Sequence, residues 1–425
     1  MLSVLFVSFL VLLGLGIPVA FSLGMSSLLY FLAAGLPVQM YTQRFFAGLD
    51  SFTLLCIPGF FLAGALMNSS GITKKLIDFS NKLVGHLDGG LAQANVVASM
   101  IFAGMSGTAL ADTVSLGGVL IPAMEEEGYD VDFSCAVTAA SSCVGPIIPP
   151  SVPMIVAATL TGISVAKLFV AGMVPGILMG IGMLIVTSVI SHKRHYPKTE
   201  RRATVKEILL SGKESFYALL MVLIILVGII GGIVTPTEAS VIAVVYGVFV
   251  GFFIYKELTI KKFITALQKT AYSSAAIMAL VGFANVFAYI LTKEQVPQMV
   301  AHWILSITNN KYLILLFINI LLIFVGMFME TIAAILILFP VLLGVVTAIG
   351  VSPIQFGVVA VLNLVLGLTT PPVGVCLFAT QSIGKVPMSK IVKELAPYLI
   401  SNFAVLFLIT YVPFFTVGIT NIFMG

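Results

Sequence analysis

The chain has 425 residues, of which 60% are hydrophobic and 9% are charged, so its composition lies far outside the usual range of soluble globular domains. This composition predicts an all-α protein that crosses a lipid bilayer several times. The net charge is only +4, but seven of the 21 Lys and Arg residues lie within residues 192–213. A basic loop of this kind orients a membrane protein, and we expect no nucleic-acid partner.

Residues 1–50 contain two apolar runs that we expect to be N-terminal scaffold helices. No basic segment precedes the first run and many apolar runs follow it, so we interpret it as a retained span rather than a cleaved signal peptide. The four cysteines have spacings that match neither a zinc site nor a redox pair. We expect them to be small packing residues; they are Cys56, Cys135, Cys143 and Cys376.

The next part of the chain contains a predicted hairpin and a broken helix. Residues 72–90 are basic and amphipathic, and we place them on the inner side of the membrane. The apolar stretch 91–124 starts and ends on that side, so we expect a re-entrant helical hairpin. Residues 132–160 must then cross outward, although the sequence GPIIPP at 145–150 interrupts them.

Two basic segments flank a pair of apolar runs in the middle of the chain. The loop 192–213 and the segment 256–269 are both predicted to be cytoplasmic by the positive-inside rule. The runs 216–234 and 238–255 between them can therefore cross the membrane and return. Their outer turn contains TPTEAS, in which Glu238 fits the third helical position of a capped helix start. We expect Glu238 to cap a helix rather than to serve as a membrane carboxylate.

Unusual sequence features recur in the same order in the two halves of the chain. GPIIPP at 145–150 recurs 222 residues later as GLTTPP at 367–372. ADTVSLGGVLIP matches METIAAILILFP at an offset of 218, which pairs Asp112 with Glu330 and places Phe324 opposite Ser106. We infer two repeats.

The two repeats are predicted to have opposite orientations in the membrane. The first hairpin opens from the cytoplasm, whereas the second, 312–348, follows an outward crossing and opens from outside. Inverted repeats with discontinuous helices are typical of secondary transporters, in which substrate and coupling ions bind near the midplane. The expected divisions are residues 1–50 (scaffold), 51–180 (first repeat), 181–271 (basic loop and scaffold pair 216–255), 272–415 (second repeat, with broken helix 356–382) and 416–425 (C-terminal end).

The two breaks are candidate ion sites. Proline removes an amide donor and glycine permits unusual backbone angles, so each break should expose carbonyl oxygens. Such backbone survives at membrane depth only inside protein or beside a cavity. Sodium would satisfy these oxygens, and the half-helix starting at Pro150 would point the positive end of its dipole at an anionic substrate. Asp112 and Glu330 are functional candidates because carboxylates in apolar surroundings are costly.

Each of these features also has a plainer interpretation. Proline and glycine can merely kink a membrane helix, the two carboxylates can make structural hydrogen bonds, and hydroxyl groups can hold helices together. A passive channel can use the same kind of broken helix, and dependence of uptake on a sodium gradient distinguishes it from a transporter. We do not expect an enzyme, since HExxH, DDxxD and GxxxxGK[ST] motifs do not occur in the sequence.

Four motifs carry a resemblance to a known family. FAGMSGTALADTVSLGGVLIPAM, SSCVGPIIPPSVPMI, GGIVTPTEAS and GLTTPPVGV resemble those of the large membrane subunit of tripartite ATP-independent periplasmic (TRAP) transporters. The order is the expected one, the resemblance covers essentially the whole chain, and it is closest to the large subunits of bacterial sialic-acid systems. It implies a multi-pass protein of the bacterial inner membrane, with two hairpins and two broken helices in a mobile transport domain on a scaffold.

The resemblance also implies an activity, partners and individual roles. The activity is sodium-driven import of a small organic acid by an elevator mechanism, with sialic acid as the first choice and a C4-dicarboxylate or sugar acid otherwise. The partners are a small four-helix membrane subunit and a periplasmic substrate-binding protein. Substrate binding or gating would involve Ser106, Gly107, Thr108, Asp112, Pro150 and Glu330. At least two Na+ ions would be held, one by Ser106, Gly145, Ile148 and Pro150, and another by Thr331, Gly367, Thr369 and Thr370. Because Phe324 is placed opposite Ser106, we expect the two ion sites to differ in their ligands.

Overall fold

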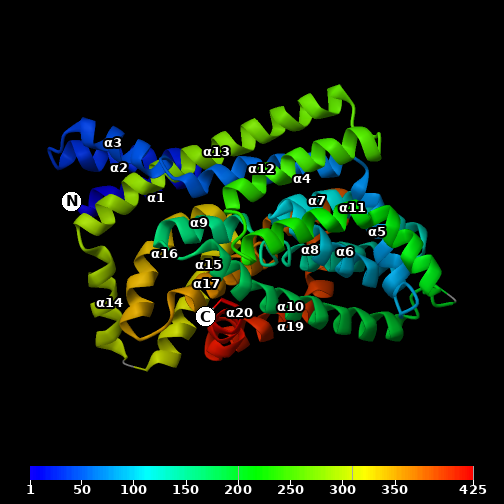
Figure 1. Cartoon of the computed structure of the whole chain (residues 1–425). Coiled ribbons are helices and arrows are strands. Elements are labelled where there is room, and N and C mark those ends of the chain that lie inside the picture. Colours follow the sequence, from blue (N-terminus) through cyan, green and yellow to red (C-terminus); the bar gives the residue numbers. More distant parts are fainter. Residues whose placement is uncertain (200, 309, 425) are drawn as a thin grey trace.

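A computed structural model describes residues 1–199, 201–308 and 310–424, apart from the side chains of residues 104–106 and 305. Helices joined by turns and short loops make up these residues, and no strand occurs among them (Figure 1). Eight helical segments of the described part are long and apolar enough to cross a membrane. The all-α class predicted from the composition is therefore confirmed.

One layer of the molecule is built around a long helix, α13 (Ile260–Lys293), which packs along α2, α3 and α4. It lies at the top of Figure 1. Helix α12 packs against α4, and α11 packs against α12. The other helices of this layer are α1 (Leu2–Gly14), α2 (Val19–Ala33), α3 (Val38–Leu49), α4 (Cys56–Ser69), α11 (Val205–Ile230) and α12 (Pro236–Phe249).

The second part of the molecule, which we call the core body, consists of two hairpins, two interrupted helices and the long helices that follow them. The first set is α6 (Gly90–Ser106), α7 (Ala109–Glu126), α8 (Val131–Ser142), α9 (Val152–Thr161) and α10 (Val165–Arg194). The second set is α15 (Lys311–Phe328), α16 (Thr331–Ala348), α17 (Pro353–Gly367), α18 (Val375–Gly384) and α19 (Met388–Tyr411). Helices α5 (Ile72–Val84) and α14 (Val296–Ile307) lead into the two sets, and α20 (Val417–Met424) ends the chain.

The helices of the two sets follow one another with nearly the same spacing. Helices α14 to α19 begin 221 to 224 residues after α5 to α10, respectively. A near-constant offset over six successive helices favours two copies of one arrangement. The turns at 107–108 and 329–330 lie inside the segments where hairpins were predicted, and the interruptions at 143–151 and 368–374 lie inside the predicted broken helices.

The predicted correspondence between Asp112 and Glu330 is wrong. Glu330 is the residue directly before α16, whereas Asp112 lies in the first turn of α7. The helix starts pair Glu330 with Thr108, and they pair Ser106 with Phe328 rather than with Phe324. The error arose because the sequence alignment matched an acid followed by threonine, and this pair occupies a different turn position in each helix.

Two smaller predictions from the sequence are confirmed. Thr235 and Glu238 form a capping box at the start of α12, in which the Thr235 amide donates to the Glu238 carboxylate at 2.7 Å and the Glu238 amide donates to the Thr235 hydroxyl at 3.2 Å. This cap satisfies backbone donors that the first helical turn leaves free. The four cysteines are free thiols and all are buried.

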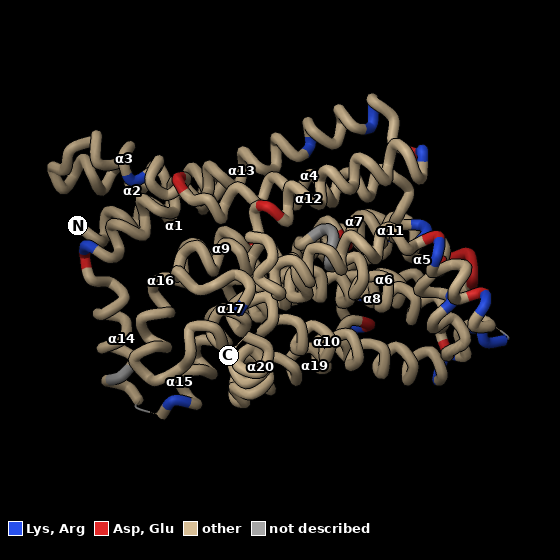
Figure 2. The backbone as a smooth tube through the Cα atoms, viewed as in Figure 1, with Lys and Arg blue, Asp and Glu red and all other residues tan. Residues whose placement is uncertain are grey.

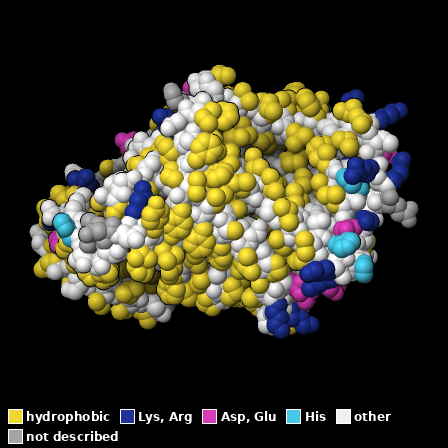
Figure 3. Space-filling view, turned by 90° about the horizontal axis from the view of Figure 1, so that it is seen from below, with side chains coloured by type: hydrophobic (Ala, Val, Ile, Leu, Met, Phe, Trp, Pro, Cys, Tyr) yellow, Lys and Arg dark blue, Asp and Glu magenta, His cyan; other side chains and the backbone are white. Residues whose placement is uncertain are grey.

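Charge is distributed unevenly along the molecule. Figure 2 shows Lys and Arg residues gathered at the end where α5, the start of α11 and the end of α10 lie. We call it the basic end; it contains residues 192–199 and 201–213. In Figure 3 hydrophobic side chains cover the middle of the visible face, while charged side chains lie toward its two ends. This pattern suits a bilayer around the middle and cytoplasm at the basic end.

Candidate functional site

The first interruption joins α8 to α9 through Gly145–Pro150, and the Pro149–Pro150 peptide bond is cis. Ser151 organises the far side of this loop. Its hydroxyl accepts a hydrogen bond from the Met154 amide at 3.2 Å, which caps α9, and it donates to the Pro146 carbonyl. Ser151 and Val152 are buried, so α9 starts inside the core body, where its dipole favours negative charge.

The tip of the first hairpin lies against this interruption. Gly107 ends α6 with a φ of +64°, and a Cβ atom added there would lie 3.0 Å from the Pro150 carbonyl oxygen. The fully buried Asp112 carboxylate lies so close to Gly145 that a Cβ atom added at Gly145 would overlap it. The structure thus brings Gly107, Asp112, Gly145 and Pro150 together as a group. The predicted role of Ser106 concerns a side chain outside the described part of the structure.

The second interruption joins α17 to α18 and meets the second hairpin through backbone contacts. A Cβ atom added at Gly367 would overlap the backbone of Gly326, and one added at Gly326 would overlap the Leu364 carbonyl. The Gly374 amide donates to the Met327 carbonyl at 3.2 Å. The Pro371–Pro372 peptide bond is cis. Glycine at these positions allows the hairpin backbone to touch the interruption directly.

Oxygen atoms gather near this second contact. The hydroxyls of Thr369 and Thr370 donate to the Leu366 carbonyl at 3.1 and 2.7 Å, so each hydroxyl oxygen keeps its capacity to accept or to coordinate. The Thr331 hydroxyl is buried at the tip of the second hairpin and has no hydrogen-bond partner among the described residues. Glu330 caps α16, because its carboxylate accepts from the amides of Ile332 and Ala333 at 2.8 and 3.2 Å.

The two interruptions belong to one packed body. Cys143, at the end of α8, has its sulfur 3.5 Å from the Thr369 hydroxyl oxygen and donates to the Val365 carbonyl at 3.5 Å. Helix α7 of the first hairpin packs against α18, and α16 of the second hairpin packs against α9. Each hairpin therefore contacts the interrupted helix of the other set.

Buried polar pairs join each hairpin to its own interrupted helix. In the first set, Asn95 donates to Thr138 at 2.7 Å and Ser99 donates to Ser141 at 2.8 Å. In the second set, Asn363 donates to the Asn319 amide oxygen at 2.8 Å. Buried hydrogen bonds of this kind favour one packing arrangement, although the Asn363 side-chain oxygen has no partner among the described residues.

In the described part of the structure, the two breaks offer backbone carbonyl and hydroxyl oxygens rather than a cluster of metal-binding side chains. No group of three or more His, Cys, Asp or Glu side chains that could hold a metal occurs among the described residues. Bound ions would rely instead on backbone carbonyl and hydroxyl oxygens, the ligands that unwound helices offer to Na+. The buried Thr331 hydroxyl without a partner fits such a site, because an unsatisfied buried polar group is otherwise costly.

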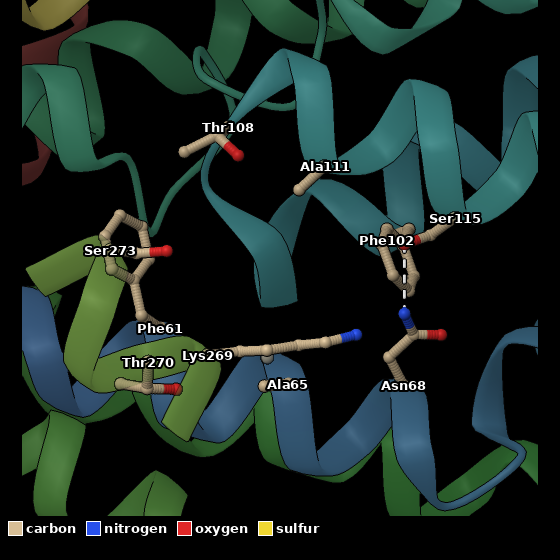
Figure 4. Close-up of a pocket in the computed structure, with 11 residues that line it drawn as sticks. Phe61, Ala65, Asn68, Phe102, Thr108, Ala111, Ser115, Lys269, Thr270 and Ser273 are labelled. Carbon is tan, nitrogen blue, oxygen red and sulfur yellow. Dashed lines mark hydrogen bonds between the residues drawn. The ribbon is translucent and has the colours of Figure 1, made fainter. Parts of the chain in front are cut away.

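A cavity of about 270 Å³ lies beside the tip of the first hairpin, between α4, α7 and α13 (Figure 4). The Asn68 side-chain amide donates a hydrogen bond across it to the Ser115 hydroxyl at 3.0 Å. Lys269 is the one charged residue among the described residues that line it. The lining residues are Phe61, Gly64, Ala65, Asn68, Phe102, Thr108, Ala111, Ser115, Lys269, Thr270 and Ser273.

Of the residues predicted to bind or gate substrate, Thr108 lines this cavity, whereas Glu330 belongs to the tip of the second hairpin. Asn68, Ser115 and Lys269 were not predicted from the sequence. Lys269 was attributed only to a cytoplasmic basic segment. No local pattern identifies these residues, since they come together only where α4, α7 and α13 pack.

Comparisons with known proteins give one consistent result. Residues 6–415 match the model of the family described as tripartite ATP-independent periplasmic transporter, DctM component. The chain is 40% identical over 414 residues to the sialic acid TRAP transporter large permease protein SiaM of Vibrio cholerae, covering 96% of each chain. It is 36% identical over 384 residues to the C4-dicarboxylate TRAP transporter large permease protein DctM of Pseudomonas aeruginosa, covering 90% of each. The solved structure of the Alcanivorax borkumensis YdaH transporter has a similar fold, with a TM-score of 0.65 and 15% identity, over 87% of this chain and 86% of that one.

Proposed function

This chain belongs to the DctM family of tripartite ATP-independent periplasmic transporters, and we propose that it is the permease subunit of a sodium-coupled secondary importer. It is a multi-pass membrane protein, and its named relatives are permeases rather than enzymes. The proposed substrate is a small organic acid, with sialic acid as the first choice and a C4-dicarboxylate or sugar acid as the alternative. The similarity to a sialic acid permease and a C4-dicarboxylate permease supports this choice.

The proposed partners follow from the family. A tripartite transporter whose relatives are termed large permeases implies a small membrane subunit, which we propose has four helices, and a periplasmic substrate-binding protein. The complex would operate in the bacterial inner membrane. The binding protein would then deliver the substrate to the face of the permease opposite the basic end.

One observation carries the proposal of ion coupling: two interrupted helices, each covered by a hairpin tip, lie in one packed body. We assign one Na+ to the first break and another to the second. The first site would use Gly145, Ile148 and Pro150 together with Ser106. The second would use Thr331, Gly367, Thr369 and Thr370.

The substrate position follows from the first hairpin tip. Thr108 lines the cavity, and its neighbours Gly107 and Asp112 contact the first break at Pro150 and Gly145. A Na+ ion held at the break would add positive charge beside the start of α9, and both would favour an anionic substrate at this tip. Binding of the ion and of the anion would therefore support each other, as coupled transport requires. Glu330 would act in gating at the second tip.

The division of the molecule suits an elevator mechanism. We propose that α1 to α4 and α11 to α13 form the stationary scaffold and that the core body moves along the membrane normal with both ion sites. The Asn68–Ser115 hydrogen bond joins the two parts. Cysteines at these two positions should cross-link under oxidising conditions, and the cross-link should block uptake until it is reduced. Cross-linking that is equal in all transport conditions and leaves uptake intact would contradict the movement.

Reconstitution tests the proposed activity directly. Liposomes containing this chain and its small subunit should accumulate labelled acid from the binding protein only when an inward sodium gradient is imposed. Dissipating the gradient with a sodium ionophore should stop accumulation. A passive channel would instead equilibrate the acid without sodium, and this result would favour the alternative function.

A further inference from the structure

The cavity beside the first hairpin lies on the boundary between the proposed scaffold and the core body. Helices α4 and α13 form one wall, with Asn68, Lys269 and Ser273, and α7 forms the other, with Thr108 and Ser115. Figure 4 shows the Lys269 side chain extending along the space between α4 and the hairpin, with its nitrogen toward Asn68. The two walls thus present different groups to the same volume.

The cavity faces the basic end of the molecule. Lys269 lies in the first third of α13, which begins at Ile260 next to that end. Along α7 the cavity extends from Thr108, at the hairpin tip, to Ser115, two turns nearer the basic end. Because basic residues mark the cytoplasmic side, the cavity lies on the cytoplasmic side of the hairpin tip.

Polar groups other than the lysine also point to a ligand. Thr270 lines the cavity, and its hydroxyl is buried beside it with no hydrogen-bond partner among the described residues. Ser273 adds an exposed hydroxyl one turn after Lys269. Phe61 and Phe102 supply apolar surface. A small hydroxylated carboxylate matches this combination, because the ammonium pairs with the carboxylate and the hydroxyls pair with polar groups on its body.

We propose that this cavity is the cytoplasm-facing substrate site and that Lys269 is a stationary counter-charge for the substrate carboxylate. This inference rests on the proposed function and deepens it. Since Lys269 belongs to the scaffold wall, it meets the substrate only after the core body has carried the hairpin tip to the cytoplasmic side. The ammonium then draws the anion away from the tip, so Lys269 determines which substrates are released and how fast.

The first test compares three variants in the reconstituted complex. Lys269→Gln should lower the maximal uptake rate of the acid by about three- to fivefold, the scale of a partly exposed ion pair. Lys269→Arg should retain most of the rate because it keeps the charge. Lys261→Gln is the matched control, since it removes an exposed lysine of the same helix outside the cavity. The concentration of sodium that gives half-maximal uptake should be unchanged in all three.

A second test measures substrate binding in the cavity without measuring transport. Ser273→Cys places a thiol in the cavity while keeping Lys269, and the native cysteines are buried. Sialic acid should slow its reaction with a methanethiosulfonate reagent, and this protection should be lost in the double variant with Lys269→Gln. Equal protection in both variants, or Lys269→Gln uptake equal to wild type, would overturn the assignment of Lys269. If the wild-type complex shows no sodium-driven uptake, the proposed function itself fails, so the two failures are distinguishable.

Discussion

The two hairpin tips occupy matching positions in the two helical sets but differ in how they contact their interruptions. Among the described residues, the first tip meets its break through the Asp112 carboxylate, which lies against Gly145, and through Gly107, where an added Cβ atom would lie 3.0 Å from the Pro150 carbonyl oxygen. The second tip meets its break through the backbone, because Gly326 lies directly against Gly367. Residues 102–105 read FAGM and residues 324–327 read FVGM, and the sequences diverge at the turn itself.

This difference suggests different roles for the two tips. A backbone contact is fixed once the helices are packed, whereas a carboxylate can respond to an ion or a substrate. The first tip also lines the cavity that contains Lys269. We infer that the first tip handles the substrate, and that the second tip provides an ion site whose geometry is set by close packing.

The largest expected effect is a loss of stability when one methyl group is added at the glycine of each break. Gly367→Ala places a Cβ atom within the backbone of Gly326, which cannot rotate away. We expect a loss of stability of about 1–3 kcal/mol or more, measured as a lower thermal midpoint in detergent. Gly145→Ala meets the Asp112 side chain instead, so it should remain better folded and lose uptake.

Gly118→Ala provides the control for both variants. Gly118 lies inside α7, and a Cβ atom added there has no neighbour within 4 Å. This variant should be as stable as wild type or slightly more stable. Equal thermal midpoints for Gly145→Ala and Gly367→Ala would remove the distinction between a side-chain contact and a backbone contact.

The next effect concerns the charges of the two carboxylates. Asp112→Asn keeps the shape of the fully buried side chain, and we expect assembled protein whose uptake falls about tenfold or more, or about 1.4 kcal/mol. Glu330→Gln should also remain assembled, because an amide oxygen can still cap α16, and its uptake should fall less. Radiolabelled uptake, normalised to protein recovered in the membrane, measures both variants.

Glu330→Ala separates the role of Glu330 as a helix cap from its proposed role in transport. Removing the cap that Ile332 and Ala333 use should cost about 1 kcal/mol of stability, which Glu330→Gln should not. If Asp112→Asn is lost from the membrane rather than assembled and slow, its carboxylate has a structural role and the contrast between the tips is wrong.

How much of this site was predictable depends on whether the signal is local. GPIIPP and GLTTPP located both interruptions, because proline and glycine act on the backbone where they stand. The capping box at Glu238 was likewise visible in four consecutive residues. Lys269 gave no such signal, because its place in the cavity depends on packing against α7, which lies about 150 residues earlier in the sequence. Asp112 and Glu330 were misaligned because residue identity was matched without knowledge of where each helix begins.

A smaller effect should appear in the sodium dependence of uptake. Thr370→Ala removes a hydroxyl from the second break, and Ser106→Ala removes one assigned to the first. Each should raise the sodium concentration for half-maximal uptake by about threefold or more, the scale of one lost polar contact. The proposed acid affinity should change more for Ser106→Ala, because only the first tip faces the cavity. Unchanged sodium dependence in both variants, at normal expression, would contradict the ion-site assignments.

The smallest expected effect is a change in thermal stability caused by a charged group at the base of the first hairpin. Asp88 precedes α6 and accepts hydrogen bonds from Lys198 at 2.6 Å and from His192 at 2.8 Å. These partners, Lys198 first, lower the pKa of Asp88 below its ordinary value. Because the folded protein lowers this pKa, the carboxylate contributes stability above the pKa it has in the unfolded chain, and this contribution is lost as the pH falls through the folded value.

Asp88→Asn should therefore lower the thermal midpoint at pH 7 by only about 1 °C, since the pair is partly exposed. The difference from wild type should stay constant down to the ordinary range of aspartate, about pH 4, and vanish below it. Lys193→Gln, an exposed residue next to His192, is the control and should show no such trend. A difference that grows on acidification would mean that the ionised Asp88 carboxylate opposes folding. The hydrogen bond from the Gly90 amide to the Pro197 carbonyl, rather than charge, would then hold the base of the first hairpin.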